Sequence, residues 1–124
     1  MSPRAAGATA HELSRVGLLA TLPGETLARL ADQMRRETIA AGSAVVDEGE
    51  KGDRFYVVLS GMLTVSQATR GPLSLLRPGD YFGEVAPAMG TPRTASVRAL
   101  TPATLASCDR ETFDEFVRPL FAED

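Results

Sequence analysis

Short apolar segments separated by glycine-containing turns are the feature that most limits how this sequence can fold. Five of them, TIA, AVV, FYVVL, MLTV and LSLL, are followed in that order by Gly42, Gly49, Gly61, Gly71 and Gly79. Segments of this length at a spacing of about 8–12 residues are typical of an all-β sandwich or barrel. Two later segments, TASVRAL and ATLASC, raise the expected number to about seven or eight strands.

The segment FYVVL predicts a strand that is buried on both faces. Side chains alternate across a strand, so Phe55, Val57 and Leu59 share one face, and Tyr56 and Val58 share the other. Because both sets are apolar, we expect this strand to be central in its sheet or covered by a helix. A hairpin turn is expected at Gly61.

Helical periodicity precedes the expected strands. Residues 11–19, HELSRVGLL, predict a short helix, and Pro23 suits the first turn of a second one. The apolar residues of this second helix recur at i, i+3, i+4 and i+7, which places them on one packing face; they are Leu27, Leu30, Ala31 and Met34.

A further helix is expected after the last strand. Asp109 suits its N-cap, and Glu111 lies in its first turn, where negative charge is favourable. The apolar face of this helix consists of Phe113, Phe116, Val117 and Leu120. Pro119 should stop or kink the helix at Arg118.

Composition favours one cytoplasmic domain. The 124 residues suffice for a single core, with residues 1–10 as a flexible tail and residues 11–124 as the domain. The sequence contains no apolar run of about 18 residues and no signal-peptide core. The single Cys108 is expected to be a buried thiol in a reducing compartment. Net charge is −3 and the basic residues are scattered, which disfavours direct nucleic-acid binding.

Residues 80–97 contain the chemistry of a small anionic ligand site. Arg93 offers a planar fork of donors that matches phosphate oxygens. Glu84 can accept a hydrogen bond from a sugar hydroxyl, and glycine and alanine let backbone N–H groups approach an anion. The candidate ligand-binding residues are Gly83, Glu84, Val85, Ala86, Arg93, Thr94 and Ala95.

This stretch closely resembles the phosphate-binding cassette of cyclic nucleotide-binding domains. The resemblance extends over residues 13–118: LPGETL resembles the helical part, GEKGDRFY has the family's turn glycines at Gly49 and Gly52, and LLRPGDYFGE leads into the cassette. It implies a mainly β fold: an eight-stranded antiparallel β-roll, jelly-roll-like and also described as a double-stranded β-helix. N-terminal helices and a C-terminal helix flank this roll, and the lid helix that many members have is truncated or lacking.

The resemblance also implies a role for each cassette residue. Glu84 would accept from the ribose 2′-hydroxyl, with a second contact from the Gly83 backbone. Arg93 would pair with the exocyclic phosphate oxygens, and Thr94 would contact the phosphate or a purine. Backbone N–H groups near Ala86 and Ala95, and a short helix after Glu84, would face the phosphate. The ligand would be cAMP or cGMP, with cAMP favoured, and no other cofactor is expected.

Two features depart from the family pattern. Pro87 stands where an aliphatic residue is usual, and it can begin the short helix instead. Because of Pro119 and the few residues after it, we expect no lid helix within these 124 residues. Contacts to the base would then come from Val65, Leu73 and Leu75 of the β-roll, from a partner chain or from additional sequence.

Four functions remain to be compared. The first is a regulatory module in which ligand binding moves the helix at 110–118, through Phe113 and Phe116, and so acts on an attached or partner effector, with a homodimer also open. The second is a cupin-type metal enzyme; it is disfavoured because the only histidine, His11, precedes the expected β-roll and no nucleophile–base pair is visible. The third is a transcription factor of the catabolite activator type. It is disfavoured because such a protein needs a helix-turn-helix, and we expect none after residue 118. The fourth is a degenerate domain that acts as a protein interaction scaffold, and the presence of both Glu84 and Arg93 argues against it. Separately, Glu84 and Arg93 could pair with each other as a structural ion pair rather than bind a ligand.

Overall fold

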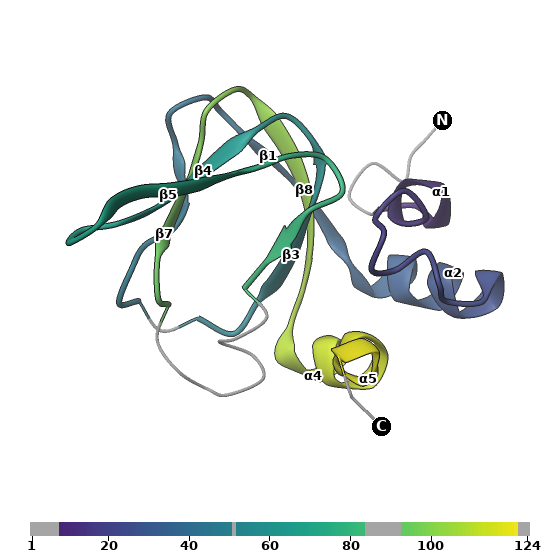
Figure 1. Ribbon diagram of the computed structural model, residues 1–124. Coiled ribbons are helices and arrows are strands. Elements are labelled where there is room, and N and C mark those ends of the chain that lie inside the picture. Colours follow the sequence, from purple (N-terminus) through teal and green to yellow (C-terminus); the bar gives the residue numbers. More distant parts are fainter. Residues whose placement is uncertain (1–7, 51, 84–92, 122–124) are drawn as a thin grey trace.

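The computed structural model describes residues 8–50, 52–83 and 93–121, and these form a β-roll with helices along one side (Figure 1). One antiparallel sheet has the order β1 (Arg35–Ile39), β8 (Ala103–Cys108), β3 (Phe55–Ser60), β6 (Tyr81–Phe82). The other has the order β2 (Ala44–Val46), β7 (Ser96–Ala99), β4 (Leu63–Gln67), β5 (Gly71–Leu76). The predicted mainly β architecture with eight strands is confirmed within these residues.

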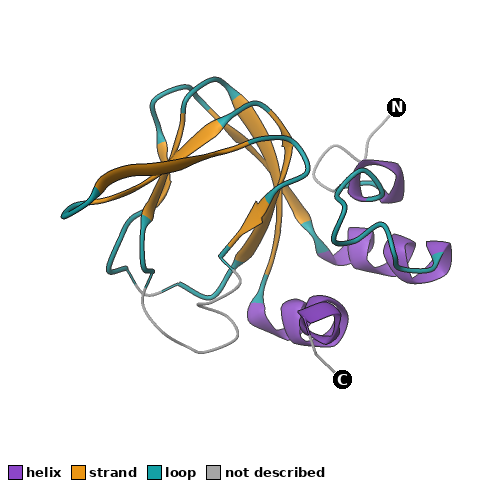
Figure 2. Ribbon diagram, in the orientation of Figure 1, coloured by secondary structure: helices purple, strands orange, loops and turns teal. Residues whose placement is uncertain are grey.

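The described helices gather beside the first sheet, on the side away from the second sheet (Figure 2). They are α1 (Ala10–Leu13), α2 (Gly24–Gln33), α4 (Arg110–Thr112), the π-helix η1 (Phe113–Val117) and α5 (Arg118–Phe121). The predicted face of α2 is confirmed, since Leu27, Leu30, Ala31 and Met34 are all buried. No helix of the described residues is long and apolar enough to cross a membrane.

Strand β3 contributes to two hydrophobic cores, as its sequence predicts. Phe55 and Val57 pack with the helices in one core. Tyr56 and Val58 pack inside the roll in the other. The strand lies between β8 and β6 in its sheet. The strand as a whole therefore lies between the core on the helical side of the molecule and the core inside the roll.

The turn at Gly61 differs from the predicted hairpin. Strands β3 and β4 do not pair with each other; they belong to different sheets, so the turn carries the chain from one sheet to the other. Gly61 has a φ of 86°, and a Cβ there would lie 2.4 Å from the Pro102 carbonyl oxygen. Glycine is therefore required for a close crossing of two turns rather than for a hairpin.

The N-terminal helix is shorter than the predicted helix over 11–19. Helix α1 begins at Ala10 with Thr9 as its N-cap in a capping box, and it ends at Leu13. Turns follow Leu13. Ser14 and Gly17 favour helix less than alanine does, so the apolar residues of this segment pack into the core without continuing the helix. Leu13, Val16 and Leu19 are nevertheless buried in the core, and so is Ala8. The division between a tail at 1–10 and a domain at 11–124 stays a prediction.

At the other end, Pro119 does not stop the helix. The Asp109 side chain accepts a hydrogen bond from the Thr112 N–H, which confirms the predicted N-cap. Just before Pro119 the helix widens into η1, where the Arg118 N–H donates to the Phe113 carbonyl five residues earlier. Proline has no N–H to donate to the carbonyl four residues before it, and the wider turn lets the chain continue as α5.

Candidate ligand-binding site

Arg93 is the centre of the candidate site, and it is unusually buried for a charged residue. Its exposed fraction is 7%. Its backbone N–H donates to the Glu50 carbonyl and its carbonyl accepts from the Gly49 N–H, both at 2.8 Å. This pair of bonds fixes Arg93 against the loop that precedes β3.

The Arg93 guanidinium lies against backbone oxygens and an aromatic ring. Its Nη2 donates to the Arg54 carbonyl at 2.9 Å, and its Nη1 lies 3.5 Å from the Gly83 carbonyl. Its Cζ is 5.8 Å from the centre of the Tyr56 ring, and this ring stacks on Phe82 with centroids 4.8 Å apart. The cation, Tyr56 and Phe82 thus form one stack, and both rings belong to the core inside the roll.

Two glycines make room for this guanidinium. A Cβ at Gly52 would lie 2.4 Å from the Arg93 Nε, and a Cβ at Gly83 would lie 2.7 Å from the Arg54 oxygen and 2.9 Å from the Arg93 Nη1. Gly83 also has a φ of 92°, which disfavours other residues. The sequence predicted a turn at Gly52 and a close approach of the Gly83 backbone to a ligand. The structure adds that both glycines leave space for the Arg93 guanidinium.

Burial lowers the pKa of Arg93, while Tyr56, Asp53 and Glu50 act in the opposite direction. An arginine remains charged even so. Among the described residues, no carboxylate forms an ion pair with it. A guanidinium has five N–H donors, and the contacts given above use only part of them. The arrangement can therefore receive an anion.

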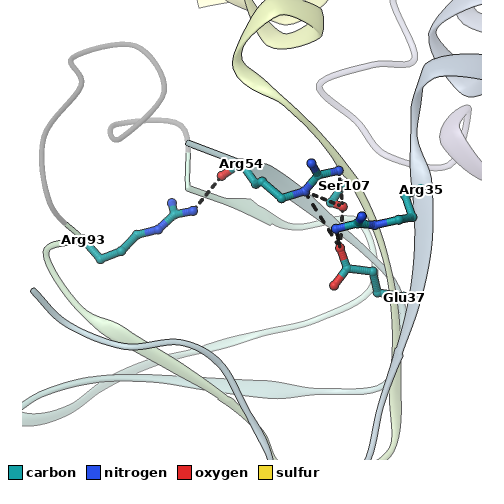
Figure 3. A network of polar contacts seen from close by, with 5 residues as sticks. All are labelled: Arg35, Glu37, Arg54, Arg93 and Ser107. Atoms are coloured by element: carbon teal, nitrogen blue, oxygen red, sulfur yellow. Dashed lines mark hydrogen bonds and ion pairs between the residues drawn. The ribbon is translucent and has the colours of Figure 1, made fainter. Parts of the chain in front are cut away.

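A second group of polar side chains lies on the other side of Arg54 from Arg93 and is joined to Arg93 through Arg54 (Figure 3). The Arg54 side chain donates to the Ser107 hydroxyl through Nε at 3.2 Å and Nη2 at 3.0 Å. Ser107 in turn donates to Glu37 at 2.6 Å, and Arg35 contacts the same carboxylate at 3.3 Å. The sequence did not predict this group. Arg35 and Glu37 come from β1, Arg54 from the residue before β3 and Ser107 from β8, so no local pattern brings them together.

The structure brings together part of the predicted residue set. Gly83 and Arg93, ten residues apart, are in contact. Thr94 follows Arg93 and is exposed, with its carbonyl accepting from Gln67 Nε2 at 2.8 Å, and Ala95 is half-buried. The remaining residues of the set, Glu84, Val85 and Ala86, lie outside the described residues, as do Pro87 and the expected short helix.

The residues suggested for base contacts occupy different environments. Val65 is half-buried against the core inside the roll, whereas Leu73 and Leu75 on β5 are each 43% exposed. Their part in ligand binding stays a prediction. Across residues 8–50, 52–83 and 93–121, no group of three or more histidine, cysteine or acidic side chains could hold a metal ion.

Comparison with known proteins identifies the family. The model of the cyclic nucleotide-binding domain matches residues 36–119, which include both sheets of the roll except for Arg35, the first residue of β1. The chain belongs to the cyclic nucleotide-binding domain family.

The relatives include cyclic nucleotide-dependent kinase components. A cAMP-dependent protein kinase regulatory subunit of Debaryomyces hansenii is 37% identical over 107 residues, covering 86% of this chain and 24% of that protein. The cGMP-dependent protein kinase egl-4 of Caenorhabditis briggsae is 33% identical, covering 87% of this chain and 15% of that protein. The solved structure of cAMP-bound PfPKA-R superposes with a TM-score of 0.85 at 27% identity, covering 90% of this chain and 39% of that one. The chain thus spans a quarter or less of these two kinase relatives.

Proposed function

We propose that this chain binds a cyclic nucleotide monophosphate, cAMP in preference to cGMP, and that binding regulates an attached or partner effector. The observation that carries the proposal is Arg93: buried, held by backbone bonds and, within the described part of the chain, not paired with a carboxylate. A cyclic phosphate supplies the missing negative charge. Support for cAMP comes from the regulatory subunit and the cAMP-bound structure named above.

Each cassette residue has a role in this proposal, which follows the family pattern. Arg93 pairs with the exocyclic phosphate oxygens, and Glu84 accepts from the ribose 2′-hydroxyl. Backbone N–H groups of the cassette complete the anion site. The residues proposed to contact or surround the ligand are Gly83, Glu84, Val85, Ala86, Arg93, Thr94 and Ala95.

Coupling to the effector is proposed to run through an aromatic cluster. Tyr81 lies two residues before Gly83, and its ring centre is 5.7 Å from that of Phe121 on α5 and 5.8 Å from that of Phe55. Phe55 in turn lies 5.2 Å from Phe113 on η1. A shift of the cassette would therefore change the packing of the C-terminal helix. No catalytic step is part of this function, which we place in the cytoplasm.

The test is calorimetric titration of cAMP and cGMP into the chain and into Arg93→Ala. Charged hydrogen bonds are worth about 1.5–3 kcal/mol, so Arg93→Ala should weaken binding about 10- to 150-fold. Arg93→Lys should also bind weakly, because it loses the fork of donors. Arg70→Ala, an exposed arginine in the turn between β4 and β5, is the matched control and should bind normally.

The result distinguishes the proposal from its alternative. Absence of binding by the unaltered chain would favour a degenerate domain that acts as a protein interaction scaffold. Binding that Arg93→Ala leaves unchanged would show that the ligand lies elsewhere. Tighter binding of cGMP than of cAMP would support cyclic nucleotide binding but reverse the proposed preference between the two nucleotides.

A further inference from the structure

Ser107 is a polar residue in the interior of the roll, close to the ligand site but without a role in the family cassette. It is 0% exposed. In the register of the first sheet it pairs with Tyr56 of β3 and Arg35 of β1. Leu105 and Ala103, which alternate with it along β8, belong to the core inside the roll, so Ser107 faces the same interior.

We propose that Ser107, with Glu37, positions Arg54 and thereby fixes the Arg93 guanidinium for the phosphate. This inference rests on the proposed function and extends it to residues outside the cassette. Ser107 and Glu37 act as positioning residues, since neither touches Arg93 in the structure. The path runs from Arg93 to the Arg54 carbonyl, and from the Arg54 side chain to Ser107 and Glu37 (Figure 3).

The hydroxyl of Ser107 uses its full bonding capacity. It accepts from Arg54 Nε and Nη2, at 3.2 and 3.0 Å, and donates to Glu37 at 2.6 Å. A hydroxyl has one donor and two acceptor sites, so all three are engaged. A buried group with this many partners has little freedom to rotate, and it restrains the side chains that it joins.

Glu37 balances the positive charge of the group. Its carboxylate contacts Arg35 at 3.3 Å and lies 4.0 Å from Arg54 Nε. Among the described residues, Glu37 supplies the carboxylate that forms an ion pair with the Arg54 guanidinium. The Glu37 and Arg54 side chains are only 23% and 25% exposed, so water screens these charges weakly.

Arg54 transmits this restraint because its side chain and its carbonyl belong to one residue at the start of β3. The side chain is held toward β8 and β1, and the carbonyl of the same residue accepts from Arg93 Nη2 at 2.9 Å. The Arg54 carbonyl also lies where a Cβ at Gly83 would clash with it. A rotation of the peptide after Arg54 would therefore disturb both the arginine and the glycine of the site.

The decisive variant is Ser107→Ala, because it removes the hydroxyl and changes no charge. We expect cAMP to bind about 3- to 10-fold more weakly: the lost hydrogen bonds are to the charged groups of Arg54 and Glu37, and only part of their free energy reaches Arg93. Glu37→Gln is less suitable because it has two opposite effects on affinity. It weakens the positioning of Arg54, but it also removes a negative charge near the site, which favours binding of an anion. Ser107→Thr keeps a hydroxyl and should restore part of the affinity.

A double-mutant comparison separates positioning from general damage. In an Arg93→Ala background, Ser107→Ala should cause no further loss of affinity, because the group it positions is absent. Leu30→Ala is the stability control: this buried residue of α2 should lower the free energy of unfolding and leave affinity unchanged. Wild-type affinity of Ser107→Ala, or an equal loss in both backgrounds, would overturn the inference.

A readout without ligand keeps the two proposals distinguishable. If the unaltered chain binds no cyclic nucleotide, the proposed function fails, and nuclear magnetic resonance of Arg93 tests the positioning alone. Rotation about its Nε–Cζ bond should be slow in the unaltered chain and faster in Ser107→Ala. Equal rates in the two proteins would refute the positioning role.

Discussion

Gly52→Ala tests directly whether the position of Arg93 determines phosphate affinity. The new Cβ would lie 2.4 Å from Arg93 Nε, 2.7 Å from Nη2 and 2.8 Å from Cζ. Ordinary van der Waals contact begins at 3.4 Å, so the guanidinium must retreat by about 1 Å. Its 2.9 Å bond to the Arg54 carbonyl would then exceed hydrogen-bond distance.

The expected loss falls on binding rather than on folding. A misplaced arginine forfeits a charged hydrogen bond to phosphate, worth about 1.5–3 kcal/mol, which corresponds to about 10- to 150-fold in affinity. Gly52 does not have a positive φ, and the clashing atoms are the mobile end of a side chain. We therefore expect the free energy of unfolding to change by less than about 1 kcal/mol.

Gly42→Ala is the matched control. Its φ of 86° strains any added side chain, but a Cβ there meets nothing within 4 Å. It should lower stability by about 1–2 kcal/mol and leave affinity unchanged, the reverse of Gly52→Ala. Calorimetric titration with cAMP and urea unfolding measure the two quantities. Wild-type affinity in Gly52→Ala would refute the reasoning that this pose of Arg93 holds the phosphate.

Two further predictions concern titratable groups away from the ligand. Burial raises the pKa of the Cys108 thiol to about 12, so a thiol reagent at pH 8 should modify the chain only as fast as it unfolds. The free energy of unfolding should also fall as pH rises above about 9, because the thiol ionises at lower pH in the unfolded chain than in the folded one. Rapid modification of the folded chain would contradict this. Hydrogen bonds from Thr112 lower the pKa of Asp109, so its contribution is present at neutral pH and declines as pH falls below its ordinary value of 3.8. Asp109→Ala should cost about 1 kcal/mol at pH 7 in urea unfolding and less in acid; an unchanged difference between the two pH values would count against the cap.

Local patterns were sufficient to predict most of the secondary structure. The glycine-separated segments correspond to strands, the α2 face is buried as its spacing requires, and the two faces of β3 enter two cores. Each of these features depends on residues close together in the sequence. The predicted cytoplasmic location and the residue roles of the cassette remain predictions.

Long-range contacts account for what the sequence did not reveal. The turn at Gly61 crosses between sheets because β3 pairs with β8, far along the chain, rather than with β4. The Arg93 acceptor, the carbonyl of Arg54, and the space at Gly52 are each set by packing across about 40 residues. The C-terminal helix continues past Pro119 with its apolar side in the core, since Phe113, Phe116 and Val117 are buried there with residues of the N-terminal helices.

The double burial of β3 has a consequence for how the domain opens. A strand that is shared by both cores cannot separate from the helices without also exposing the interior of the roll. Its amide protons should therefore exchange with solvent only when the whole domain unfolds, so that the two cores behave as one cooperative unit. A ligand held beside the start of this strand would stabilise that whole unit, and its binding would slow exchange in β3 as far as Ser60, well beyond the atoms it touches.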